Sequence, residues 1–278
     1  MSSESIDAEA FTAWETEGWE VRAATYLRLF SPLTSRFIEP LLDVAGVGTG
    51  TRLLDVATGP GFAAGLAARR GATATGVDIA AAMVELAGTL HPGVRFMQVN
   101  AEELPFDDGS FDAVVGNLAI LHFARPEHAV REFARVLAPG GRLALSTWDV
   151  PAESRMPGVF FQAIQEAGAA PPPDVPAGPP FYRFADEAEF TRLLAQAGLA
   201  DPSVETVTMR TAIPSAETLW DWLLDATVRA GGVVRAQPTD VQKTIRDNLD
   251  RIAAPYTDAT GALDLPVSIK IGHARRDT

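Results

Sequence analysis

The chain has no cysteine, so disulfides, thiolate metal sites and a cysteine nucleophile are excluded. Basic residues are scarce: 23 Lys and Arg stand against 36 Asp and Glu, giving a net charge of −13 and a pI near 4.7. No run of Lys or Arg is present, and this balance argues against a nucleic acid or an anionic membrane as the main partner. No stretch approaches the roughly 18 apolar residues of a membrane span. No basic and apolar export signal follows Met1, so we expect a cytoplasmic protein.

What the chain does have is apolar material and regular alternation. Its 278 residues are 47% hydrophobic, enough for two average domains or one large α/β domain with insertions. Short apolar runs alternate with amphipathic segments over residues 51–150, and this spacing indicates βαβ units and a parallel sheet covered on both faces. The predicted strands are 52–57, 74–78, 94–99, 111–116 and 142–148, and the helices among them are 62–70, 80–90 and 126–137.

The remainder of the chain is less regular. Helices are expected over 8–17, 19–30 and 32–45 before the alternating region, and over 157–170, 186–197, 216–229 and 239–252 after it, with late strands at 204–213 and 262–271. We therefore predict an α/β fold: a Rossmann-like, doubly wound, mostly parallel seven-stranded sheet with helical caps. Residues 1–50 form an N-terminal helical lid and 51–150 the ligand-binding core. Residues 151–278 supply the rest of the sheet (about 184–213 and 262–273) and cap insertions at about 151–183 and 214–262.

The strongest local feature is a glycine turn between the first strand and its helix, Asp55-Val56-Ala57-Thr58-Gly59-Pro60-Gly61-Phe62. Besides a plain tight turn, two ligand readings compete. Gly59 to Ala64 fits the dinucleotide pattern G-x-G-x-x-A, and Asp78 follows at the end of the second strand, where it suits ribose hydroxyls. The Asp55 carboxylate opposes this reading because it would repel a pyrophosphate, whereas it suits an ammonium or sulfonium group. These residues alone leave the choice open.

Three further segments follow in order: the acid-bearing loop Asn100-Ala101-Glu102-Glu103-Leu104-Pro105-Phe106, the strand 111–115, and the motif Leu137-Ala138-Pro139-Gly140-Gly141-Arg142-Leu143. With the glycine turn, this set resembles the class I S-adenosylmethionine (SAM)-dependent methyltransferases, particularly the ubiquinone/menaquinone methyltransferase branch. The resemblance covers about residues 50 to 150 and is specific for fold and cofactor, not for substrate. It departs from the family pattern at Ala57, where glycine is usual and a methyl group would narrow the methionine end of the pocket.

The resemblance implies a role for each matching residue. Asp55, Ala57, Gly59 and Gly61 would line the methionine part of SAM. Asp78 would bind the ribose hydroxyls, with Ile79 and Met83 packing on the adenine. The remaining assignments are Ala101 and Glu102 at the adenine edge, and Asn117, whose backbone carbonyl would face the ligand ammonium.

Methyl transfer needs a base only where the accepting atom must lose a proton. His122, just past the fourth strand, is the candidate catalytic base, against a helix-start histidine that satisfies backbone groups or packs on the cofactor. Tyr26 is the best of the N-terminal aromatic residues for a lid over the sulfonium, because its hydroxyl would also reach the cofactor carboxylate. Asp149 lies at the end of the fifth strand, where it would orient the methyl acceptor or cap a helix or loop. No cluster of His, Asp or Glu has the spacing of metal ligands, so we expect no metal.

The predicted function is methyl transfer from SAM to an O, N or C atom of a small, partly apolar metabolite. Two alternatives stay open. The same scaffold can catalyse a non-methylating reaction such as cyclisation with SAM bound, because fold does not fix chemistry. The glycine turn also leaves an NAD(P)-binding oxidoreductase of Rossmann type.

Overall fold

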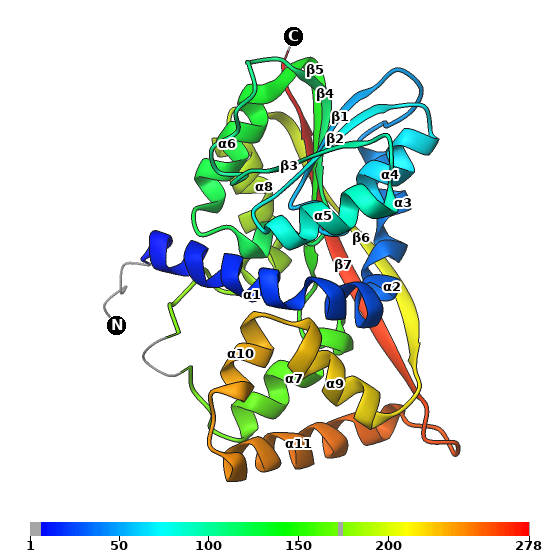
Figure 1. The fold of residues 1–278 in the computed structure, drawn as a ribbon, viewed down its shortest axis with the longest axis vertical. Coiled ribbons are helices and arrows are strands. Elements are labelled where there is room, and N and C mark those ends of the chain that lie inside the picture. Colours follow the sequence, from blue (N-terminus) through cyan, green and yellow to red (C-terminus); the bar gives the residue numbers. More distant parts are fainter. Residues whose placement is uncertain (1–6, 172–174, 278) are drawn as a thin grey trace.

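The computed structural model, which describes residues 7–171 and 175–277, is built around one seven-stranded sheet (Figure 1). The strand order is β3-β2-β1-β4-β5-β7-β6, which confirms the predicted α/β class. None of the helices in these ranges is long and apolar enough to span a membrane. The strands are β1 (Arg52–Val56), β2 (Thr73–Asp78), β3 (Arg95–Gln98), β4 (Phe111–Gly116), β5 (Leu137–Trp148), β6 (Ala200–Ile213) and β7 (Leu263–Arg275).

The first five strands run parallel, and β7 pairs antiparallel with both β5 and β6. β1 and β4 are buried almost throughout because helices cover both faces of the sheet, which accounts for their continuous apolar runs. Parallel strands end at a common edge, so the loops after β1, β2 and β4 meet there. This carboxyl edge is where open α/β sheets bind ligands.

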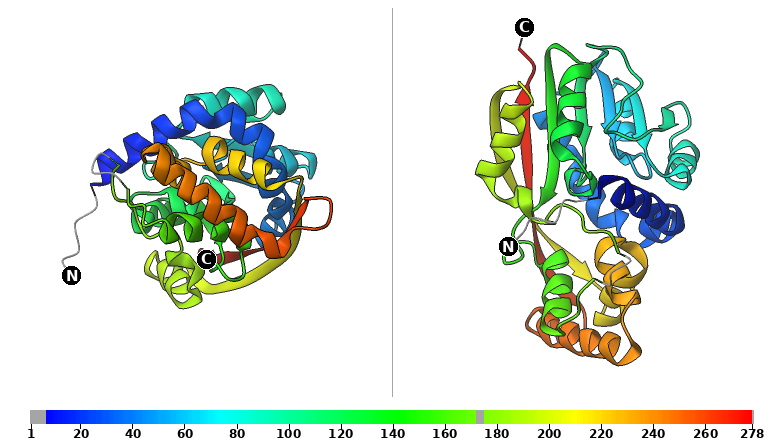
Figure 2. Two further views of the ribbon diagram at one scale, coloured as in Figure 1. Left: turned by 90° about the horizontal axis from the view of Figure 1, so that it is seen from below. Right: turned by 90° about the vertical axis from the view of Figure 1, so that its left-hand side faces the viewer.

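Two helical layers sandwich the sheet (Figures 1 and 2). One contains α3 (Ile38–Val44), α4 (Phe62–Arg69) and α5 (Ala81–Leu90), and the other contains α6 (Pro126–Val136) and α8 (Glu187–Gln196). Each layer has its own apolar core against the sheet. The parallel part is thereby a closed scaffold that exposes only its strand ends.

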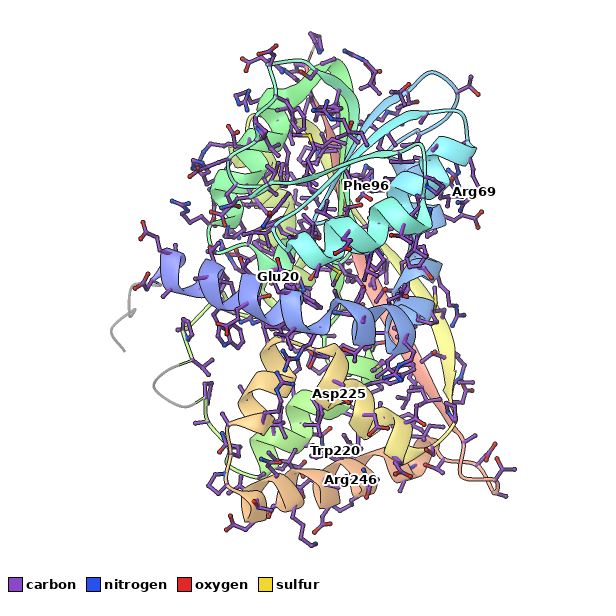
Figure 3. All side chains as sticks on the ribbon, viewed as in Figure 1. Glu20, Arg69, Phe96, Trp220, Asp225 and Arg246 are labelled. Atoms are coloured by element: carbon purple, nitrogen blue, oxygen red, sulfur yellow. The ribbon has the colours of Figure 1, made fainter. Side chains whose placement is uncertain are left out.

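A helical cap lies beyond the carboxyl edge, at the lower end of Figure 1. The long β6–β7 hairpin extends into it, and α1 (Ala8–Leu29) crosses between core and cap, packing on α5 and on α9. In Figure 3, Glu20 of α1 and Asp225 of α9 mark these two contacts: Glu20 accepts hydrogen bonds from the amides of Ala81 and Ala82, and Thr25 donates to the Asp225 carbonyl. The cap helices are α7 (Arg155–Glu166), α9 (Ala216–Ala226), α10 (Arg229–Arg235) and α11 (Thr239–Ala253).

Several element boundaries differ from the predictions. The predicted helix 32–45 is α2 (Ser31–Thr34), a 3₁₀ turn (Ser35–Phe37) and α3, and three further differences have a visible cause. α1 is one helix where we predicted a break at Gly18; the glycine is there because a Cβ would lie 2.4 Å from Val228 of the cap. The predicted helix 216–229 is instead two helices, because Thr227 is extended and its hydroxyl accepts the Gly231 amide at 2.8 Å. β5 begins at Leu137, ahead of the prediction, with a bulge opposite Phe111–Ala113 that takes up the Pro-Gly-Gly sequence.

Candidate active site

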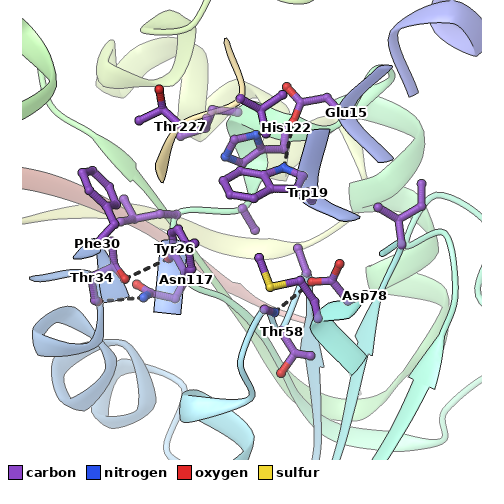
Figure 4. A pocket seen from close by; sticks show the side chains of 18 of the residues that line it. Glu15, Trp19, Tyr26, Phe30, Thr34, Thr58, Asp78, Asn117, His122 and Thr227 are labelled. Carbon is purple, nitrogen blue, oxygen red and sulfur yellow. Dashed lines mark hydrogen bonds and ion pairs between the residues drawn. The ribbon is translucent and has the colours of Figure 1, made fainter. Parts of the chain in front are cut away.

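A large cavity opens at the carboxyl edge of the sheet, bounded by the strand ends, α1 and the cap (Figure 4). It holds about 1500 Å³ of empty space, including its mouth. Every site residue predicted from the sequence except Gly61 lines it: Tyr26, Asp55, Ala57, Gly59, Asp78, Ile79, Met83, Ala101, Glu102, Asn117 and His122.

Asp55 at the end of β1 is almost completely buried. Its Oδ2 accepts hydrogen bonds from the Thr58 hydroxyl at 2.6 Å and from the amide of Ala64, in the first turn of α4, at 3.0 Å. Burial raises the pKa of Asp55 to about 7, although both hydrogen bonds oppose the rise. The carboxylate therefore occupies the helix N-terminus on which a bound phosphate would otherwise rest.

Asp78 ends β2 and organises the glycine turn beside it. Its Oδ2 accepts the Gly59 amide at 2.8 Å and its Oδ1 accepts the Ala80 amide at 3.0 Å. Burial also raises the pKa of Asp78. Gly59 has φ +53° and no atom within 4 Å of the position of a Cβ, so its backbone borders open cavity. This cradle has room for a ligand directly against the turn.

Gly61, the other predicted glycine of the turn, is not among the residues that line the cavity. It begins α4 with φ +81°, and a Cβ there would lie 2.7 Å from the Phe96 ring and 2.9 Å from Ala87. The glycine allows α4 to pack closely against α5 and β3.

Tyr26 and Asn117 are held by a hydrogen-bond network centred on Thr34. The Tyr26 hydroxyl bonds the Thr34 hydroxyl at 2.9 Å, and the Asn117 side chain donates to the Thr34 carbonyl at 2.9 Å. Ser146 donates to the other end of the Asn117 amide at 3.1 Å. Burial raises the pKa of Tyr26 to about 12, so this hydroxyl stays protonated and fixed. In the structure its partner is the Thr34 hydroxyl.

Glu102 lines the cavity from the loop after β3, but its carboxylate is already paired. It accepts from the Arg125 amide at 3.0 Å and from Arg125 Nε at 2.8 Å, and it is only 2% exposed. The carboxylate thereby ties its loop to the start of α6. Ala101 beside it supplies an apolar wall.

The polar residues that sequence reasoning missed come from α1 and the cap. Glu15 is 3% exposed, and its Oε2 lies 3.0 Å from His122 Nδ1 and accepts from Trp19 Nε1 at 2.9 Å (Figure 4). Arg229 at the start of α10 donates to the Leu121 carbonyl and stacks over Phe11 and Phe181. The i, i+4 spacing of Glu15 and Trp19 was the available signal, but it names no partner on another element.

Several aromatic rings also line the cavity. Trp19 packs edge-on against Tyr26 at 5.4 Å and against His122 at 5.3 Å between ring centroids. Phe30 and Trp148 meet deeper in the cavity at 6.1 Å. The cap adds three further rings to the lining: Phe160, Phe161 and Phe181.

Asp149 and two of the other histidines lie outside the cavity. Asp149 is buried outside the cavity, accepting from the Ser268 hydroxyl at 2.8 Å, with Lys270 Nζ at 3.6 Å. His91 packs between Phe62 and Phe96, and His273 lies 3.4 Å from Glu205. Across residues 7–171 and 175–277, no group of three His, Asp or Glu has metal-binding geometry.

Comparison with known proteins finds similarity to methyltransferases in the parallel part of the sheet and its helices. Residues 54–145 match a model described as a methyltransferase domain. The chain is 37% identical over 132 residues to a demethylmenaquinone methyltransferase of Thermus thermophilus, covering 44% of this chain and 60% of that protein. It is 32% identical over 143 residues to the demethylmenaquinone methyltransferase of Clavibacter sepedonicus, covering 49% and 56%. The matches span less than two thirds of either relative.

Solved structures share the fold at low identity. A Haemonchus contortus phosphoethanolamine N-methyltransferase, solved with phosphomonomethylethanolamine and S-adenosylhomocysteine, superposes with a TM-score of 0.58 at 16% identity, covering 95% of this chain and 60% of that one. The [4+2]-cyclase SpnF gives 0.53 at 22% identity, covering 88% and 81%.

The fold and the sequence match together define the class of this region: residues 54–145 match a methyltransferase domain, and the fold is shared with solved methyltransferases. Within that class, the matched part of the chain is similar to demethylmenaquinone methyltransferases.

Proposed function

We propose that the protein transfers a methyl group from SAM to an O, N or C atom of a small, partly apolar metabolite. The observation that carries this proposal is one cavity in which the Asp78–Gly59 cradle and an aromatic chamber containing His122 are continuous. The −13 charge favours a small acceptor over a nucleic acid.

The residues present fit the cofactor. The Asp78 carboxylate accepts from hydroxyls, and the open space beside Gly59 admits a ligand against the turn. Ile79, Met83 and Ala101 offer apolar surface for a nucleobase, and Asp55 places negative charge near the glycine turn, where a cationic amino acid end would lie. Asn117 and Ala57 complete that end of the cradle.

The acceptor chamber lies toward the cap. SAM held by the cradle would supply a methyl group already activated as a sulfonium, so this chamber mainly has to hold the acceptor in line with that methyl group. Aromatic faces such as Trp19 attract a cation and exclude water. His122 accepts the proton that the acceptor atom must lose.

The same geometry disfavours a dinucleotide. A pyrophosphate at this turn would use the amides at the start of α4. Asp55 already accepts the Ala64 amide there, and its ionised form would repel the phosphates, because two like charges this close disfavour each other. Because Asp55 and a pyrophosphate would compete for the amides at the start of α4, this site favours SAM over NAD(P).

Two measurements test the proposal. Titration calorimetry with SAM, S-adenosylhomocysteine, NAD(H) and NADP(H) should show binding of the first two ligands only. Incubation of apolar acceptor candidates with deuteromethyl-SAM, followed by mass spectrometry, should show a deuteromethyl product and S-adenosylhomocysteine. An isomerised product without an added methyl, the outcome expected of a cyclase such as SpnF, would overturn methyl transfer; tight nicotinamide binding without SAM binding would overturn the cofactor assignment.

A further inference from the structure

The buried carboxylate of Glu15 projects from α1 into the acceptor side of the cavity. Its Oε2 contacts His122 Nδ1 at 3.0 Å and accepts from Trp19 Nε1 at 2.9 Å, whereas no described residue hydrogen-bonds its buried Oε1. A carboxylate that is 3% exposed and half unsatisfied costs folding free energy, and such a group beside a cavity calls for an explanation. Glu15 is therefore a candidate for a functional role.

The hydrogen bond to Glu15 fixes the protonation pattern of the imidazole. An ionised carboxylate only accepts, so Nδ1 must carry the hydrogen in the contact, and in a neutral imidazole Nε2 is then left with its lone pair. Trp19 donates to the same oxygen and packs edge-on against the His122 ring, which prevents the carboxylate and the ring from rotating apart.

The free nitrogen has access to the cavity. His122 lines it, its side chain is 25% exposed, and Nε2 has no hydrogen-bond partner among the described residues. Charged groups surround the ring from three elements: Glu15 on α1, Asp78 at the end of β2, and Arg229 on α10. Arg229 also donates to the carbonyl of Leu121, directly before His122, and so holds the turn that carries the histidine.

We infer that Glu15 is a positioning residue that holds His122 with Nδ1 protonated and Nε2 free to take a proton from the methyl acceptor. The inference rests on the proposed function. The acceptor's O–H, N–H or acidic C–H bond breaks, its proton goes to Nε2, and the resulting imidazolium is stabilised by the Glu15 charge. The acceptor class this selects is one that must be deprotonated.

Nitrogen NMR of the histidine rings tests the pairing without any ligand. Protein labelled with ¹⁵N-histidine is measured at about pH 9, where an ordinary imidazole is neutral; the four histidines are assigned with single His→Gln variants. In the native protein, Nε2 of His122 should resonate as an unprotonated nitrogen and Nδ1 as a protonated one. Glu15→Ala should lose this pattern, and Glu15→Gln should retain it because the amide oxygen still accepts.

Glu17→Ala is the matched control, since it makes the same change on the exposed side of the same helix and should leave the spectrum unchanged. Thermal unfolding and S-adenosylhomocysteine calorimetry verify that each variant is folded. With an acceptor found by the product screen, Glu15→Ala should lower kcat about 10- to 100-fold at unchanged KM for SAM, with partial recovery in Glu15→Gln.

The outcomes separate the two proposals. A protonated Nε2 in the native protein, or a spectrum unaffected by Glu15→Ala, overturns the positioning role even where methyl transfer is found. An Nδ1-protonated His122 that depends on Glu15, in a protein that methylates nothing and binds no SAM, overturns the proposed function and leaves the pairing established.

Discussion

Asp55→Asn should stabilise the protein against unfolding at neutral pH and leave its stability unchanged at acid pH, in each case compared with the native protein at the same pH. Burial raises the pKa of the Asp55 carboxyl from its ordinary 3.8 to about 7 in the fold. The folded state thus binds this proton more tightly than the unfolded chain does. The stabilisation is complete below about pH 4 and is lost as the pH rises to about 7.

The size of the effect follows from this interval. At about 1.4 kcal/mol for each pH unit, the range from 3.8 to about 7 corresponds to about 4 kcal/mol, which is an upper bound for one buried group. Asparagine has no charge to desolvate, and its amide oxygen can still accept from Thr58 and Ala64. The substitution therefore imitates the protonated acid at every pH.

Urea unfolding followed by tryptophan fluorescence, repeated between about pH 4 and about pH 8, measures the free energy of unfolding of both proteins. The difference between variant and native protein should be near zero at the acid end, grow with pH, and level off above about pH 7. Asp107→Asn, an exposed turn residue, should show no such trend. A difference that is flat or shrinks as the pH rises would refute the reasoning.

Three further predictions follow from the site and the packing. Asp78→Ala should weaken SAM binding about 10- to 100-fold in calorimetry, because it removes a charged acceptor and the anchor of the Gly59 amide; unchanged affinity would contradict the assignment. His122→Ala should lower turnover of a protonated acceptor about 100-fold or more, and full turnover at neutral pH would leave His122 as a packing residue. Gly18→Ala should lower the free energy of unfolding by about 1–3 kcal/mol through its clash with Val228. Gly88→Ala, in a helix with open space around it, should instead be neutral or stabilising by up to about 1 kcal/mol. Equal changes in the free energy of unfolding for Gly18→Ala and Gly88→Ala would contradict the proposed clash with Val228.

The core could be predicted because its signals are local. The apolar runs at 52–57 and 111–116 form strands buried on both faces. The glycine turn between β1 and α4 needs positive φ angles at Gly59 and Gly61, which glycine adopts readily. Ala57 lies in the same turn and adopts φ +49°. This left-handed value explains why glycine is usual at this position. Helix ends in the cap were harder, because the break at Thr227 depends on a hydroxyl contact four residues away.

The site was predictable only in part. Residues at strand ends share one edge by topology, so Asp55, Asp78 and Asn117 could be placed together from the sequence. Gly61 was placed in the cavity although it packs against Phe96, since a glycine pattern does not say whether the space beside it is filled by ligand or by protein.

The sequence by itself determined the fold, the sheet edge at which the cavity opens and the residues at the strand ends, because hydrophobic period and turn chemistry act over a few residues. The tertiary structure alone decided which residues meet across the cavity. Glu15 and His122 are 107 positions apart, and their contact exists only because α1 crosses the carboxyl edge between core and cap. The position of α1 depends on its packing against α5 and α9, which cannot be predicted from the local sequence pattern.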